Sequence, residues 1–278
     1  MTYYEAYQFG CEQLEQVQIK EAKLDARLLL EYVCGTDRND LLVRPERELT
    51  EEENAEYTAF IARRALHEPL QYITGEQDFM GLTFATDPST LIPRQDTETL
   101  VEEILPHLHD GMRLLDVCTG SGCILLSLLK YSNDCVGMGC DLNPDAVALA
   151  KKNGEMLGIE AEFVQSDLFE EIEGIYDIIV SNPPYIETQV IETLDTVVKG
   201  YEPHTALDGG EDGLDFYRRI IADAKKYLRR EGKLFFEIGC EQAEQVSKLL
   251  SEAGYKEVTV RKDLAGLDRV VYATYMEE

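Results

Sequence analysis

From residue 112 onward, short apolar segments typical of β-strands alternate with amphipathic segments typical of α-helices. Neighbouring parallel strands need a crossover, usually a helix, so this alternation predicts a doubly wound α/β sheet. Ligands of such sheets bind beyond the carboxyl ends of the strands. The predicted strands are RLLDVC, CVGMGC, AEFVQ, YDIIV, KLFFEIG, EVTVRK and RVVYATY, and the predicted helices are Gly122 to Tyr131, NPDAVALAKKNGEML, DFYRRIIADAKKYLRR and EQAEQVSKLLSEAG.

The first part of the chain, residues 1–74, is predicted to be a separate, all-helical domain. In KLDARLLLEYVCG, the residues Leu24, Leu28 and Tyr32 recur at the spacing of one helix face, and Gly35 stands where such a helix would end. The segment offers packing faces and no obvious catalytic chemistry.

Residues 75–95 contain glycines, prolines and short alternating runs, and they predict a β-hairpin linker. A helix is expected to resume in DTETLVEEILPHL, with Asp96 or Thr97 as its N-cap. The α/β domain is therefore expected to span residues 96–278. The chain of 278 residues is long enough for one large domain and one small domain.

The charge balance limits the partners of the chain. Lysine and arginine number 26 against 54 aspartate and glutamate residues, which gives a formal charge of −28. Phosphate backbones repel such a chain, so we expect no direct nucleic acid partner. No apolar run approaches the roughly 18 residues of a membrane span, so no membrane partner is expected. The acidity suits a basic protein partner, and solubility alone explains it equally well.

Cysteine and histidine spacings predict a cytoplasmic protein without a metal site. The seven cysteines include no CxxC pair, which favours reduced thiols over a disulfide framework or a zinc site. The four histidines show no metal-ligand spacing with the cysteines. The N-terminus, MTYYEAYQFGCEQLEQ, lacks the basic start and apolar core of a signal peptide.

Two predicted strand ends carry residues suited to a nucleoside-bearing cofactor. LDVCTGSGC places Cys118, Gly120 and Gly122 at alternate positions after the first strand, and glycines there let the backbone approach a ligand closely. Asp141 follows the second strand, where a carboxylate commonly accepts both hydroxyls of a ribose. The glycine loop could equally be a structural turn, and Asp141 could be the cap of the next helix.

A third strand end supplies SDLF, residues 166–169. Asp167 could accept a hydrogen bond from an exocyclic amino group, while Leu168 packs on a base. The alternative interpretation is that Asp167 is an ordinary loop acid.

The fourth strand ends in Asn182-Pro183-Pro184-Tyr185, the NPPY motif. A planar amide or aromatic amine nitrogen is a poor nucleophile because its lone pair is delocalised. The Asn182 side-chain oxygen and the Pro183 carbonyl can accept its two hydrogens, which turns the lone pair toward an electrophile. Tyr185 can stack on the flat substrate group. The motif therefore indicates a site that presents such a nitrogen to an electrophile, more than a proline-ended loop.

The quoted motifs resemble those of class I, S-adenosylmethionine-dependent methyltransferases. More closely, the chain resembles the HemK/PrmC family, the peptide chain release factor N5-glutamine methyltransferases. The resemblance covers nearly the whole chain and rests on LDARLLLEYV, PLQYITGEQDFMGLTF, LIPRQDTETLV, DVCTGSGC, SDLF, YDIIVSNPPYI, YEPHTALDGGEDGLDFYR, FFEIGCEQ and LAGLDRVVYA. The phrases around IPRQDTE and ALDGGEDGLDFYR are much more specific to the family than the glycine loop.

The resemblance implies a Rossmann-like, seven-stranded methyltransferase domain that uses S-adenosyl-L-methionine and releases S-adenosyl-L-homocysteine. It implies methylation of the side-chain amide nitrogen (N5) of the glutamine in the GGQ loop of class 1 release factors, a protein methylation that serves translation termination. We expect a monomer whose helical domain binds the release factor away from that loop.

The resemblance also assigns roles to individual residues. The cofactor would contact Cys118, Thr119, Gly120, Ser121, Gly122, Asp141, Asp167, Leu168 and Asn182, and the glutamine would be held by Asn182, Pro183, Pro184 and Tyr185. Arg94, Thr97 and Glu98 are expected to border the pocket, although Thr97 and Glu98 also suit a helix start.

Cys118 departs from the family pattern, which usually has glycine at this position. A small side chain fits there if φ is negative, whereas a positive φ would be strained. Direct displacement on a sulfonium needs no covalent intermediate, so we do not expect Cys118 to be a nucleophile.

Three other functions fit parts of the pattern. A DNA adenine N6-methyltransferase also uses NPPY, but it would be expected to bring a basic groove. A ribosomal-protein glutamine N5-methyltransferase would share the fold and the loop chemistry. A binding module that has lost catalysis would not need an intact NPPY motif and Asp141.

Overall fold

The computed structural model describes residues 1–194 and 196–276. Within this part of the chain, one compact unit comprises Met1–Glu76 together with Thr196–Tyr201, and the remaining described residues form a second. We refer to them as the helical unit and the sheet unit. No helix among the described residues is long and apolar enough to cross a membrane.

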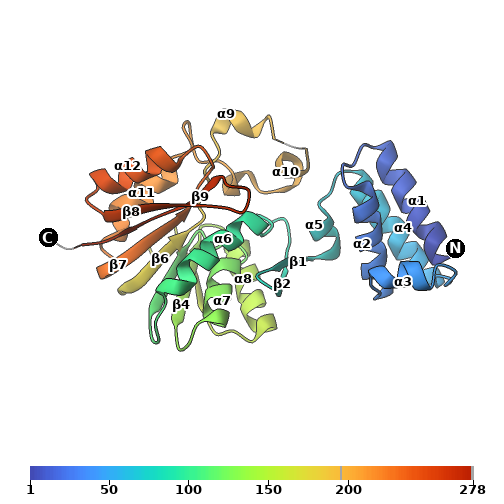
Figure 1. Ribbon diagram of the computed structural model, residues 1–278, viewed down its shortest axis with the longest axis horizontal. Helices are drawn as coiled ribbons and strands as arrows, with labels where there is room; N and C mark the ends of the chain where they lie inside the picture. The colour runs from blue at the N-terminus through green and yellow to red at the C-terminus, as the bar shows by residue number, and fades with distance from the viewer. Residues whose placement is uncertain (195, 277–278) are drawn as a thin grey trace. The chain divides into compact units, whose positions relative to one another are not determined.

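The helical unit consists of short helices around one apolar core (Figure 1). Its helices are α1 (Tyr3–Gln16), α2 (Ala22–Cys34), α3 (Arg38–Val43), α4 (Glu51–Ala65), α5 (Leu70–Thr74) and α10 (Thr196–Tyr201). The expected face of α2 is wrong, because Leu24 and Tyr32 remain 39% and 43% exposed. The buried face instead contains Ala26, Leu29 and Leu30. Ala26 packs closely against Gly10 of α1, where an added Cβ would lie 3.0 Å from the Ala26 Cβ, so this contact has little room for larger side chains.

A two-stranded sheet forms the predicted hairpin, with β1 at Glu76–Phe79 and β2 at Leu82–Ala85. Polar and apolar contacts attach β2 to the sheet unit. Asn153 on α8 (Pro144–Leu157) accepts a hydrogen bond from the Ala85 amide at 2.7 Å and donates one to the Ala85 carbonyl at 3.2 Å. Phe84 is fully buried in the adjacent core.

The second unit is built on a seven-stranded sheet in the order β5-β4-β3-β6-β7-β9-β8. Neighbouring strands from β5 to β7 are parallel, and β9 runs antiparallel to both β7 and β8. The predicted α/β class and the seven strands are therefore confirmed. The strands are β3 (Arg113–Val117), β4 (Val136–Asp141), β5 (Glu162–Gln165), β6 (Tyr176–Ser181), β7 (Leu228–Glu237), β8 (Lys256–Lys262) and β9 (Asp268–Thr274).

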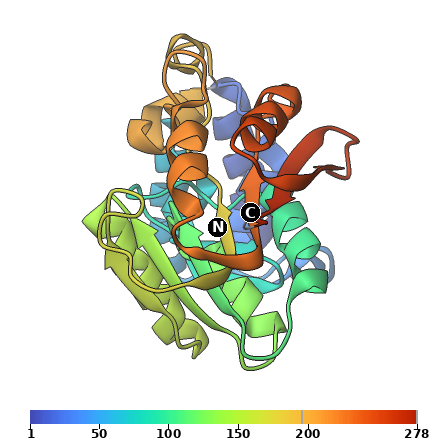
Figure 2. The same cartoon turned by 90° about the vertical axis from the view of Figure 1, so that its left-hand side faces the viewer.

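Helices cover both faces of this sheet, with α11 and α12 on one side and α7 and α8 on the other (Figures 1 and 2). The helices and 3₁₀ turns of this unit are α6 (Gln95–Ile104), η1 (Leu105–His107), α7 (Cys123–Tyr131), α8, α9 (Thr188–Ile191), η2 (His204–Ala206), α11 (Asp215–Ala224) and α12 (Ala243–Glu252). Such coverage explains why the central strands are apolar on both faces.

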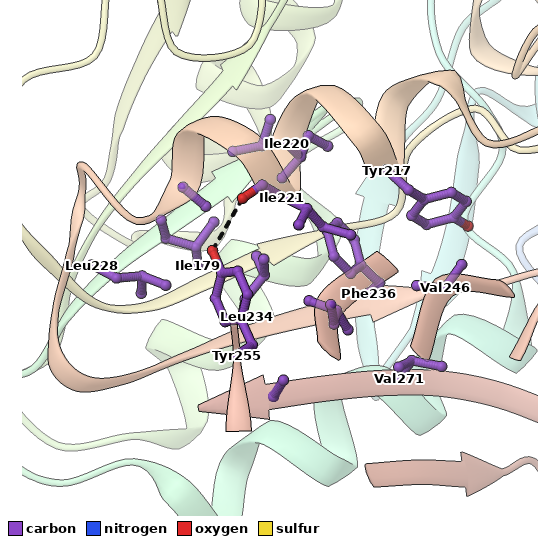
Figure 3. Packing of buried hydrophobic residues seen from close by; sticks show 14 of the residues in the cluster. Ile179, Tyr217, Ile220, Ile221, Leu228, Leu234, Phe236, Val246, Tyr255 and Val271 are labelled. Atoms are coloured by element: carbon purple, nitrogen blue, oxygen red, sulfur yellow. Dashed lines mark hydrogen bonds between the residues drawn. The ribbon is translucent and has the colours of Figure 1, made fainter. Parts of the chain in front are cut away.

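Alternating residues of the central strands enter two separate cores. Ile178 and Phe235 belong to the core beneath α6, α7 and α8, whereas Ile179 and Phe236 belong to the core beneath α11 and α12. Figure 3 shows the second core, where Ile221 and Tyr217 of α11 pack with residues of β7, and the Tyr217 and Phe236 ring centroids lie 5.2 Å apart. The strands are thereby fixed from both sides, and their carboxyl ends form a rigid edge.

Two predicted element boundaries are wrong. The segment KKYLRR was expected to continue a helix, but α11 ends at Ala224 and β7 begins at Leu228, which pairs with Tyr176 of β6. Pairing with a neighbouring strand overrides the local helix preference there. Neither Asp96 nor Thr97 caps α6, because Arg94 occupies the N-cap and gives no side-chain cap.

Candidate active site

The glycine loop after β3 is tied to the end of β4 by hydrogen bonds. The Gly120 amide donates to Asp141 Oδ2 at 3.0 Å, and the Thr119 amide donates to the Cys140 carbonyl at 2.9 Å. Asn143, and not Asp141, caps α8, since its side-chain oxygen accepts from the Asp145 amide. The Asp141 carboxylate instead connects the end of β4 to the loop after β3, the two segments that were expected to hold a nucleoside.

Cys118, Gly120 and Gly122 all adopt the left-handed conformation, with φ of 62°, 54° and 79°. A positive φ at Cys118 is the strained case, because a Cβ in this region crowds the following carbonyl. Burial is the main cause that raises the pKa of the Cys118 thiol well above its usual value. A thiol that stays protonated is a poor nucleophile, in keeping with the expectation for this residue.

Asp116 lies fully buried at the end of β3, directly below the loop. The Thr119 hydroxyl donates to its Oδ2 at 2.6 Å, but Oδ1 has no hydrogen-bond partner among the described residues. Burial raises the pKa of Asp116 to about 7, and it also raises the pKa of Asp141. Asp116 has no exposed surface, so it acts on this edge by holding Thr119 of the loop, whereas Asp141 is the carboxyl that a ligand can reach.

A hollow of about 570 Å³ opens between the ends of β4 and β5. It is lined by Leu142, Val164, Gln165, Ser166, Asp167, Glu170 and Glu171. Asp167 therefore lines the hollow, although Arg219 of α11 also donates to its Oδ1 at 2.7 Å. Leu168, at φ 53°, is only 6% exposed and belongs to the core beneath α11. A base in the hollow would meet only the small exposed part of this side chain.

The NPPY corner follows β6, whose residues from Ile178 to Ser181 pair with β3. Ser181 aligns with Val117 and its hydroxyl donates to the Val117 carbonyl at 2.6 Å. This contact places Asn182 beside the start of the glycine loop. Pro183 is buried, and burial raises the pKa of Tyr185 to about 12, so its phenol stays neutral.

The segment 207–213, from the ALDGGEDG phrase, supports the corner from behind. The Ile186 amide donates to the Leu207 carbonyl at 3.0 Å, and the Gly209 amide donates back to the Ile186 carbonyl at 2.8 Å. A Cβ on Gly209 would lie 2.7 Å from the Tyr185 Cα, closer than such atoms approach, so only glycine fits. Gln242 completes the support by donating to the Tyr185 carbonyl at 3.0 Å.

The structure adds Glu237 to this corner, a residue to which the sequence analysis gave no role. Glu237 ends β7 and is 2% exposed, and its carboxyl hydrogen-bonds the side chains of Thr97 and Asn182. The Asn182 Nδ2 atom also donates to Thr97 Oγ1 at 3.5 Å. The sequence did carry one signal for Glu237, since a glutamate follows the apolar run KLFF at the carboxyl end of a predicted strand. Glutamate is rarely buried, so a buried glutamate at such a position suggests a functional role.

The three linker residues have different surroundings. Thr97 is 3% exposed and faces Asn182, so it does border the corner. Arg94 forms a salt bridge to Glu202, whose side chain is almost fully buried. Glu98 points elsewhere, since its Oε1 accepts from the Met80 amide in the turn of the hairpin at 2.6 Å.

The chain matches known methyltransferases in sequence and in structure. Residues 5–75 match the PrmC N-terminal domain, and residues 94–200 match the methyltransferase small domain. The release factor glutamine methyltransferase of Geobacter sulfurreducens is 43% identical over 259 residues, which cover 93% of this chain and 91% of that protein. The release factor glutamine methyltransferase of Clostridium acetobutylicum is 43% identical over 256 residues, or 90% of each chain.

One solved structure shows the fold without close sequence similarity. The T. thermophilus 16S rRNA N2 G1207 methyltransferase, in complex with AdoMet and guanosine, has a TM-score of 0.53 at 20% identity, covering 72% of this chain and 49% of that one. This likeness concerns the fold alone.

Proposed function

The chain belongs to the family of release factor glutamine methyltransferases, and from this premise we propose that it methylates the GGQ-loop glutamine of class 1 release factors, on the side-chain amide nitrogen, with S-adenosyl-L-methionine as donor. The chain is thus a methyltransferase, as the motifs predicted. The observation that carries the proposal is the position of the NPPY corner, which the Ser181–Val117 hydrogen bond holds beside the glycine loop.

The cofactor fits the edge formed by β3, β4 and β5. The loop Cys118–Gly122 would run close to the nucleoside and the Asp141 carboxylate would accept from its ribose hydroxyls, with Asp167 and Leu168 at the base. When bound, S-adenosyl-L-methionine supplies an electrophilic methyl group, and S-adenosyl-L-homocysteine is the product.

The corner residues orient the substrate amide. Asn182 Oδ1 and the Pro183 carbonyl accept its two N–H hydrogens, which localises the nitrogen lone pair and directs it away from the corner. Pro184 contributes rigidity, because its ring fixes φ, and Tyr185 supplies a flat apolar face. The proton leaves the nitrogen only after the new bond has formed, so no general base is needed before that step.

The substrate is proposed to be a whole protein whose recognition is shared between the two units. A chain with a formal charge of −28 attracts a basic partner, and the helical unit is a compact unit distinct from the sheet unit that carries the catalytic corner. We assign it the binding of the release factor away from the GGQ loop. The enzyme acts as a monomer and, because its substrate works on ribosomes, in the cytoplasm.

Mass spectrometry tests the proposal directly. A purified class 1 release factor incubated with this protein and S-adenosyl-L-methionine should gain one methyl group, mapped to the loop glutamine. A release factor with glutamate at that position should gain none, since it lacks the amide nitrogen. Methylation of a ribosomal protein in its place, or of DNA, would overturn the assigned substrate.

A further inference from the structure

Asparagine 182 can serve as an acceptor only if its side-chain amide has one of two orientations. Its oxygen and nitrogen lie on opposite sides of Cγ, and rotation by half a turn exchanges an acceptor for a donor. With the nitrogen facing the substrate, two donors would oppose each other and the amide would not be bound. Something in the protein must therefore select the productive orientation.

Two groups contact the amide nitrogen in the structure. Thr97 Oγ1 accepts from Nδ2 at 3.5 Å, and the Glu237 carboxyl hydrogen-bonds both Asn182 and Thr97. An ionised carboxylate can only accept hydrogen bonds, so it selects the nitrogen side of the amide. The Thr97 hydroxyl can then donate to Glu237 and accept from Asn182, which closes a small network.

We propose that Glu237 is a positioning residue, whose ionised carboxylate acts with Thr97 to hold the Asn182 nitrogen and so present Oδ1 to the substrate amide. The inference rests on the proposed function of the corner and assigns an orienting role to a residue outside the NPPY motif. The Glu237 side chain is only 2% exposed, and its Oε2 has no hydrogen-bond partner among the described residues. Burial of such a carboxyl costs free energy, and an orienting role explains why it is present.

A pH dependence follows from this role. Burial raises the pKa of Glu237 to about 7, and a protonated carboxyl can donate to Asn182 Oδ1 and stabilise the wrong orientation. Turnover should therefore rise as the pH increases through about 7. Around Glu237, Arg269 of β9 favours the charged form and Asp96 of α6 opposes it. The other ionisable neighbours are Tyr185, Tyr217 and Cys123, whose pKa values are raised away from neutrality by burial.

The Glu237→Gln variant tests the proposal, because glutamine has the same shape but can donate as well as accept. We expect kcat to fall about 10-fold or more at pH 8 and the cofactor Kd to change little. The part of the pH dependence of kcat near 7 that Glu237 causes should disappear. Asp116 also has a pKa of about 7, but it is unchanged in the variant. The difference between the wild-type and variant pH profiles of kcat therefore measures the contribution of Glu237 alone. Thr97→Val should lower kcat in the same direction, and Thr97→Ser should restore most of it.

The matched control is Asp177→Asn, which neutralises a buried carboxyl at the amino end of β6, where it contacts Arg229 and the Arg113 amide. This control should leave the pH profile unchanged. A wild-type enzyme that methylates release factors, together with a Glu237→Gln variant of normal kcat and unchanged profile, would overturn the inference while leaving the proposed function intact.

A measurement without turnover separates the two claims. The side-chain NH₂ signal of Asn182 in an NMR spectrum, assigned by its loss in Asn182→Ala, should shift with pH near 7 in the wild type and not in Glu237→Gln. Absence of that titration in the wild type contradicts the role of Glu237, whatever the substrate proves to be.

Discussion

A buried ion pair of the helical unit and two buried carboxyls at strand ends of the sheet unit differ in how completely they are paired. In the helical unit, Asp25 is matched by Arg64, whose Nε lies 2.7 Å from Oδ2, and both side chains are 11% exposed. In the sheet unit, Asp116 and Glu237 are buried with one oxygen each that has no partner among the described residues. A paired charge is what a structural role requires, whereas an incompletely paired one at a strand end indicates a group that serves a ligand or a catalytic neighbour.

The largest expected effect is on catalysis, at the strand ends of the sheet unit. Asn182→Ala removes the acceptor for the substrate amide, so kcat should fall by at least about 100-fold. The cofactor Kd should stay within about 3-fold, since the loop and Asp141 are untouched. Calorimetry beside a methyl-transfer assay checks both numbers, and near-normal turnover would refute the acceptor role.

The corresponding change in the helical unit should affect stability and leave catalysis alone. Arg64→Leu leaves the buried Asp25 carboxylate without its ion-pair partner, which should lower the free energy of unfolding of that unit by about 3–5 kcal/mol. Turnover of a short GGQ peptide should be unchanged. Denaturation curves measure the loss, and adding Asp25→Asn should recover part of it; no recovery would mean that the ion pair is not the cause.

Two glycine substitutions compare a crowded position of the sheet unit with an open position of the helical unit. Gly209→Ala places a Cβ 2.7 Å from the Tyr185 Cα and 2.9 Å from the Pro184 carbonyl oxygen, so the corner must move. We expect kcat to fall roughly 10- to 100-fold. Gly200→Ala, at a site of the helical unit with no atom within 4 Å, is the matched control and should be neutral. Equal kcat values for the two variants would contradict the supporting role of the segment 207–213.

The smallest expected effect concerns the strained start of the glycine loop. At φ 62°, residue 118 favours glycine, so Cys118→Gly should be more stable than Cys118→Ala by about 1 kcal/mol, although alanine fills more of the buried space. Thermal unfolding of the two variants measures the difference. If the alanine variant were the more stable one, the left-handed conformation would not be the controlling factor at this position.

Much of the fold could be predicted from the chain alone, because it depends on local periodicity. The apolar runs RLLDVC and YDIIV became central strands, and the helices between them follow from crossover connections. The errors occurred where long-range contacts decide the structure. The residues from Leu228 to Arg230 begin β7, where Leu228 pairs with Tyr176 of β6, and α2 turned a face containing Ala26 toward its core.

The candidate site also contains residues that local sequence patterns predict and residues that only the folded chain brings together. The glycine loop, Asp141 and NPPY are short contiguous motifs, and each was predicted from the spacing of neighbouring residues, although their roles remain predictions. Thr97, Glu237 and Gly209 come from three distant segments and meet Asn182 or Tyr185 only in the folded chain. Nothing in the local sequence around Glu237 specifies which side chain it contacts.

The order of residues along the chain determined the central strands, the turns and the contiguous NPPY motif, because these depend on preferences that act over a few positions. Tertiary structure alone decided which side chains contact Asn182 and how closely Gly209 approaches the Tyr185 backbone. Those features depend on distances between segments that only packing and sheet register can set.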